Sequence, residues 1–152
     1  MSPLHFLLMS VAGLQAPALG NPGEAKVLAT VEAYHRAFEQ RDLEAMRPLF
    51  DPDLLVFEAG GIDRGRDAYL GHHLGPELKE LSAWKTSGMA MQAHVLGDLA
   101  YVTCTFTYEA AFSSGKTARG QATETLALAS VKGSWVIRHL HWSSRPLKAV
   151  KP

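Results

Sequence analysis

The sequence has a single cysteine and no net charge, and both features limit what the protein can be. Cys104 cannot form an intramolecular disulfide, and its alternation with Val102 and Phe106 predicts a small buried residue. Lys and Arg total 15, as do Asp and Glu, so the formal net charge is zero. A nucleic-acid binder normally carries a basic footprint, so we expect no nucleic-acid partner.

Several catalytic signatures are also missing. The 152 residues contain no P-loop, no dinucleotide-binding glycine fingerprint, no Gly-x-Ser-x-Gly motif and no local zinc signature. These absences remove several classes of nucleotide-dependent enzyme, serine hydrolase and zinc enzyme. The sequence therefore predicts no cofactor, although a divalent metal belongs to one alternative interpretation given below.

Residues 1–20 lack Asp, Glu, Lys and Arg altogether. The run 4–14 is mostly apolar but too short for a membrane span, and Ala16-Pro17-Ala18 offers small residues at the positions that a signal peptidase reads. We therefore expect 1–18 to be a cleaved signal peptide of an exported protein, periplasmic or secreted. The alternative is an ordinary apolar arm of a cytoplasmic protein. Residues 19–152 are predicted to form one domain without a membrane span.

The folded part begins with helices and ends with strands. "NPGEAKVLATVEAYHRAFEQRD" predicts an amphipathic helix, and a short helix follows Asp42. "DLLVFEAGGIDRG" is typical of a strand, a glycine turn and a return strand. Residues 67–74 predict a further helix, and Gly75 and Pro76 predict a turn after it, before another short helical piece. From Trp84 onward, alternating residues predict long antiparallel strands. This order indicates an α+β fold with the helices on one face of the sheet.

The last predicted strand reads "WVIRHLHWSSRP" and places two histidines two residues apart. Successive side chains of a strand point to opposite faces, so His139 and His141 share a face. An unperturbed histidine titrates near pH 6.5, which suits proton transfer or metal ligation. Two structural histidines are the plain alternative.

The segments "VEAYHRAFEQRDLEAMRPLF" and "GSWVIRHLHWSSRP", with the strand end Phe57-Glu58 before a glycine turn, resemble the nuclear transport factor 2-like superfamily. The likeness is to its SnoaL-like branch, over about residues 24–146, and that group includes ketosteroid isomerase and polyketide cyclases. It implies a cone-shaped, strongly curved antiparallel sheet wrapped around N-terminal helices, with a pocket open at one end. It also implies homodimers through the outer sheet face, and it places His139 and His141 toward the pocket.

The candidate site residues follow from these faces. Glu58 lies on the apolar side of a strand end, where burial raises a carboxyl pKa, so Glu58 or a histidine is the candidate base. Tyr108 or the second histidine would stabilise developing negative charge. His73, Glu124 and Arg145 are candidate ligand-binding residues, and Glu124 shares the apolar face of its strand with Leu126 and Leu128. The acid-and-tyrosine constellation of ketosteroid isomerase cannot be placed on this chain, so no steroid activity is carried over.

Three functions remain open at this point. The first is a domain that binds a small apolar or carbonyl-containing molecule and, if catalytic, works as an isomerase, dehydratase or cyclase by general acid/base chemistry. The second is a metal-binding module with imidazole and carboxylate ligands. The third is a non-catalytic dimerisation or partner-binding domain that uses the surface around Trp142. The candidate metal ligands are His139, His141, Glu58, His73 and Glu124.

Overall fold

The computed structural model describes residues 22–147. The predicted signal peptide, 1–18, lies outside the described residues, so its cleavage and the export of the chain stay predictions. In the described range, no helix is both long enough and apolar enough to cross a membrane.

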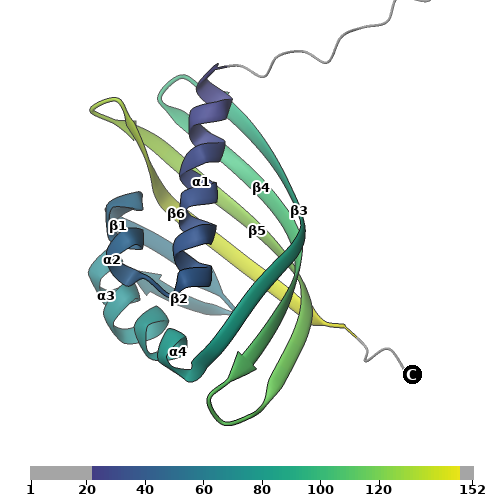
Figure 1. Cartoon of the computed structure of the whole chain (residues 1–152). Helices are drawn as coiled ribbons and strands as arrows, with labels where there is room; N and C mark the ends of the chain where they lie inside the picture. Colours follow the sequence, from purple (N-terminus) through teal and green to yellow (C-terminus); the bar gives the residue numbers. More distant parts are fainter. Residues whose placement is uncertain (1–21, 148–152) are drawn as a thin grey trace, which may run out of the picture.

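Four α-helices and six strands make up the described chain (Figure 1). The helical part comprises α1 (Pro22–Gln40), α2 (Leu43–Met46), a 3-10 turn (Arg47–Leu49), α3 (Arg66–Ala68), a π-helical segment (Tyr69–Leu74) and α4 (Gly75–Glu80). The strands are β1 (Phe50–Glu58), β2 (Gly61–Arg64), β3 (Leu81–Leu96), β4 (Leu99–Phe112), β5 (Thr117–Val131) and β6 (Ser134–Pro146).

The strands form one curved sheet in the order β2-β1-β6-β5-β4-β3. The long strands curve around α1, while α2, α3 and α4 gather beside β1 and β2 (Figure 1). Neighbouring strands run antiparallel except β1 and β6, which are parallel. The predicted α+β cone is thus confirmed, and the sheet is mixed because β1 joins the far edge of the meander beside the last strand.

The core lies between α1 and the concave face of the sheet. Val27, Val31 and Tyr34 recur at helical spacing and are buried, as an amphipathic helix on a sheet requires. On β4, Val102 and Cys104 are buried, while Thr103 and Thr105 are exposed. The concave face is thus largely apolar and the convex face largely polar.

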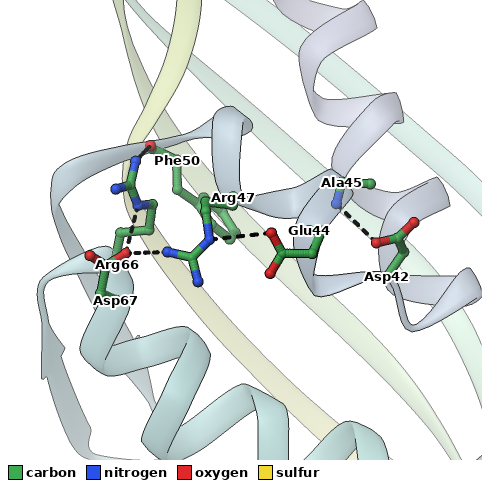
Figure 2. Close-up of polar contacts among 7 residues, drawn as sticks. All are labelled: Asp42, Glu44, Ala45, Arg47, Phe50, Arg66 and Asp67. Carbon is green, nitrogen blue, oxygen red and sulfur yellow. Dashed lines mark hydrogen bonds and ion pairs between the residues drawn. The ribbon is translucent and has the colours of Figure 1, made fainter.

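A small polar network fixes the short helices against β1 (Figure 2). The Asp42 carboxylate caps α2 by accepting the amide N–H three residues later. Arg47 contacts Asp67 at 2.5 Å, and Arg66 donates both to Asp67 and to the carbonyl of Phe50. The hydrogen bond from Arg66 lowers the pKa of Asp67. The network lies at the start of the helical segment 66–80.

That segment stays helical from 66 to 80, although glycines and a proline predicted a turn within it. The Gly75 amide donates to the carbonyl of Leu70, five residues back, so the chain widens into a π-helical turn. A Cβ at Gly75 would lie 2.5 Å from that carbonyl oxygen, so only glycine fits. Pro76 then occupies the first turn of α4, where its missing N–H removes no hydrogen bond.

A β-bulge in β6 decides which of its side chains face the core. Ala127 is paired with His139, but the next residue of β5, Leu128, is paired with Ile137. Arg138 is therefore an extra residue, and the alternation of β6 reverses at this point. One inserted residue moves every later side chain to the opposite face.

Candidate functional site

A cavity of about 380 Å³ lies between α1, α4 and the concave face of the sheet. Its wall is mostly apolar and aromatic, with a few carboxylates and one histidine, which is the usual make-up of a small-molecule site. The lining residues are Tyr34, His35, Phe38, Glu58, Tyr69, Leu74, Glu77, Glu80, Leu81, Trp84, Phe106, Tyr108, Ala110, Phe112, Ala118, Glu124, Leu140 and Trp142.

Glu58 occupies the end of β1 beside a histidine with three carboxylate neighbours. His73 Nδ1 lies 2.6 Å from Asp63, and its Nε2 lies 3.2 Å from Glu77 and 3.7 Å from Glu58. Burial, and then the negative charge of Glu77, raise the pKa of Glu58. Burial lowers the pKa of His73, but the hydrogen bond with Asp63 and the nearby carboxylates outweigh it, so the net pKa is raised. The group thus pairs a carboxyl inclined to hold a proton with an imidazole inclined to be charged.

A second histidine and carboxylate meet in the wall of the cavity. His35 of α1 and Glu124 of β5 approach to 3.0 Å between Nε2 and Oε2, and the Glu124 side chain is only 3% exposed. The contact is not aligned as a hydrogen bond, and neither atom has another hydrogen-bond partner in the described chain. Cys104 pairs with Glu124 across β4 and β5. Burial, and then the charge of Glu124, raise the pKa of the Cys104 thiol to about 12.

Three tyrosines reach the cavity. Tyr34 and Tyr69 are each 3% exposed, and burial followed by carboxylate charges raises the pKa of both phenols. They therefore stay protonated and available as hydrogen-bond donors at neutral pH. Tyr108 lines the cavity as expected, stacked on Trp84 at 4.6 Å between ring centroids, and its hydroxyl donates to Ser144 Oγ at 3.4 Å.

The structure places His139 and His141 outside this cavity, which corrects the face assigned to them. They pair with Ala127 and Thr125 on the convex side, because the bulge at Arg138 reverses the alternation after Ile137. His139 Nδ1 lies 2.9 Å from the carbonyl oxygen of Leu55. Both rings meet Phe57 edge-on, at 4.9 and 6.0 Å between centroids.

The bulge also moves Trp142 into the cavity wall, whereas the sequence placed it on the outer face. Arg145 is exposed near the end of β6 and is not among the residues that line the cavity. Glu58, Tyr108 and Glu124 line the cavity, and His73 lies beside Glu58. The structure thus brings together four of the predicted residues and separates His139, His141 and Arg145 from them.

Sequence reasoning missed His35, Asp63 and Glu77 as site residues. His35 carried a signal, because it is the one histidine among the regularly spaced apolar positions of α1. Glu77 also carried one, since it follows His73 by four residues and so shares its helical face. The position of Asp63 depends on how β2 pairs with β1, and no local pattern indicates that.

Two groups in the described chain have the side-chain types and spacing of metal ligands. One comprises His35, Cys104 and Glu124, and the other Glu58, His73 and Glu77. Neither contains His139 or His141, so the ligand set expected from the sequence is not assembled at one place.

A curved sheet around one long helix, with a mostly apolar pocket on the concave side, defines the class of small α+β cone domains. The SnoaL-like domain profile matches residues 27–147, so the chain belongs to the SnoaL-like family, within the nuclear transport factor 2-like superfamily. No curated protein matches the sequence.

Several solved structures share the fold. A candidate ketosteroid isomerase from Shewanella frigidimarina is 25% identical with a TM-score of 0.69, over 76% of this chain and 92% of that one. A candidate dehydratase of the NTF2-like family from Streptomyces avermitilis is 19% identical with a TM-score of 0.69, over 82% and 96%. The association domain of CaMKII from C. elegans is 21% identical with a TM-score of 0.64, over 81% and 99%.

Proposed function

We propose that the protein binds a small carbonyl compound with an apolar body in the cavity and catalyses proton transfer next to the carbonyl group. Isomerases, dehydratases and cyclases of carbonyl compounds all use this step. The observation that carries the proposal is Glu58, a carboxyl of raised pKa at the wall of an aromatic cavity, backed by His73.

Each residue has a chemical role in this proposal. Glu58 takes a proton from the carbon beside the carbonyl and returns it to another carbon in an isomerisation, or to a departing hydroxyl in a dehydration. Negative charge then develops on the carbonyl oxygen, and a protonated phenol of Tyr34 or Tyr69 donates a hydrogen bond to it. His73, held by Asp63 and Glu77, lies 3.7 Å from Glu58, and its positive charge offsets part of the rise in the pKa of Glu58 and so favours the basic carboxylate.

The family supports this assignment at the level of reaction type. Two of the similar structures bear the names of a candidate isomerase and a candidate dehydratase, and both cover most of this chain. The fold alone also serves proteins without catalysis, so residues rather than fold carry the proposal.

The test is proton exchange on a panel of small ketones and enones in deuterated water, followed by NMR. We expect deuterium incorporation with the native protein and a loss of roughly 10² to 10⁴ in rate for Glu58→Gln, the range associated with a general base. His141→Ala is the control, because it lies on the convex face, and it should retain the native rate. Equal rates for Glu58→Gln and the native protein would refute the proposal.

We also propose that two copies associate through the convex face of the sheet. Tyr101 is 40% exposed there, stacked on His94, and the family resemblance implies such a dimer. Sedimentation at several protein concentrations tests it, and a monomer throughout would count against it.

A further inference from the structure

We propose that His35, Cys104 and Glu124 form a zinc site in the wall of the cavity. The site goes beyond the proton-transfer function proposed above and does not depend on it. None of its ligands takes part in the Glu58 and His73 group.

The three ligand atoms come from three different elements and converge in the core. His35 projects from α1, and Cys104 and Glu124 are direct partners on β4 and β5. A ring nitrogen of His35, Cys104 Sγ and a carboxylate oxygen of Glu124 all lie within 4.8 Å of one another. Tetrahedral zinc with bonds of about 2.0–2.3 Å holds its ligand atoms about 3.3–3.6 Å apart. His35 Nε2 and Glu124 Oε2 lie 3.0 Å apart, so these two atoms need to move apart only slightly to bind the ion.

Unmet polar atoms point to a missing partner. Glu124 Oε2 and His35 Nε2 are buried and face each other without forming a hydrogen bond. Buried polar atoms in native proteins almost always have a hydrogen-bond partner or an ion. A cation between these two atoms would satisfy both at once. In the described chain, no protein group donates a hydrogen bond to either of them.

The charges also balance. A thiolate from Cys104 and a carboxylate from Glu124 neutralise a divalent cation, and a neutral His35 adds no charge, so the loaded site is electrically neutral in an apolar interior. A metal-bound thiol is deprotonated outright, so binding releases protons and weakens as the pH falls.

The donor set selects zinc over hard cations. Zinc binds cysteine, histidine and carboxylate ligands in a tetrahedron, whereas magnesium and calcium take oxygen ligands. The other group, Glu58, His73 and Glu77, has no sulfur and its histidine already bonds Asp63. Three protein ligands leave a fourth zinc position free, and His35 and Glu124 both line the cavity. That position is therefore accessible to a small molecule.

Cobalt substitution tests the site directly. The metal-free, untagged full-length protein is titrated with Co²⁺, and absorption is recorded before and after Zn²⁺ is added. We expect one equivalent of Co²⁺, tetrahedral visible bands, a near-ultraviolet thiolate-to-cobalt band, and loss of all three with Zn²⁺. Because Cys104 is the only cysteine, a thiolate band in the native protein identifies the ligand without any variant.

Variants then separate the two candidate groups. Cys104→Ser keeps nearly the same side-chain volume, and it should lose the thiolate band and bind cobalt at least tenfold more weakly. Glu124→Gln should also bind cobalt at least tenfold more weakly but keep the thiolate band. His73→Gln is the matched control and should bind cobalt as the native protein does. A folded native protein that takes up no Co²⁺ or Zn²⁺ at equimolar concentration overturns the proposal. The proposal is also overturned if the native protein binds cobalt without a thiolate band and the His73→Gln variant no longer binds cobalt.

Discussion

The two faces of one sheet use histidine in opposite ways. On the concave side, His35 and His73 come from helices and each contacts carboxylates beside a cavity. On the convex side, His139 and His141 come from β6 and contact a backbone carbonyl and a phenylalanine ring. In the described chain, no ion pair joins either convex histidine to a carboxylate.

This difference shows that the groups around a histidine, more than the presence of a histidine, indicate where acid/base chemistry can occur. A histidine against a carbonyl and a ring is held in place, whereas a histidine among buried carboxylates has its proton affinity changed. Which face a strand residue occupies depends on a single bulge, and the following experiments act on that face assignment or on the partners.

Deleting Arg138 should have the largest effect. Without the extra residue, the side chains of β6 alternate without interruption, so Ile137 and the pair Leu140 and Trp142 fall on opposite faces of the sheet. Either Ile137 or that pair must then leave the core. We expect the free energy of unfolding to fall by about 5 kcal/mol or more, summing buried side-chain losses, which approaches the whole stability of a small domain. Chemical denaturation followed by circular dichroism measures it.

Arg138→Ala is the control for that deletion. It keeps the bulge and removes only the 3.3 Å contact with Asp51, so we expect a loss of about 1 kcal/mol. If the deletion and the substitution cost the same, the bulge does not set the face of β6.

Two neighbouring residues test the face assignment more finely. Leu140 is 1% exposed in the core, so Leu140→Ala should cost about 2–5 kcal/mol. His139→Ala removes one hydrogen bond to a carbonyl and should cost about 1 kcal/mol. The same denaturation assay compares the two variants. A larger loss of stability for His139→Ala than for Leu140→Ala would contradict the assignment of the histidines to the convex face.

Leu140 and His139 also show which parts of the structure could be predicted from the sequence. The apolar stripe of α1 and the alternation of β4 and β5 predicted an α+β fold with the helices on one face of the sheet, because those patterns are local and uninterrupted. Glu124 was placed on the core face of β5 for the same reason. The cone shape was expected only from the family resemblance. The bulge at Arg138 has no marker within β6, since it arises from pairing with two other strands at once. Parity counted from Ile137 therefore assigned the wrong face to everything beyond it.

The carboxylates around His73 were missed for a related reason. Asp63 reaches the histidine because β2 folds back on β1, and Glu77 reaches it because the helical segment continues through Gly75. Sequence reasoning expected a turn there, so it placed His73 near Tyr69 but could not supply its partners.

Substituting His73 should change how stability depends on pH. Its pKa is raised in the folded state, so its stabilising effect is fully present below the ordinary value of 6.5 and is lost as pH rises through the folded pKa. We expect His73→Gln to be less stable than the native protein by about 1 kcal/mol at pH 6, with a smaller difference at pH 9. A constant difference across this range would mean that the imidazole charge contributes nothing. Thermal unfolding in matched buffers measures it.

The smallest effect is expected for His141→Ala. The residue is exposed on the convex face, and in a single copy of the chain its replacement should change stability by no more than about 0.5 kcal/mol. A covered face would behave differently, because a partner copy stabilises the folded state by mass action and makes the melting temperature rise with protein concentration. We therefore measure the melting temperatures of the native protein and of His141→Ala over a hundredfold range of concentration. Parallel, flat curves would leave the convex histidines as surface residues. Curves that rise for the native protein and flatten for the variant would show that His141 supports an interface between copies, while the concave histidines serve the cavity.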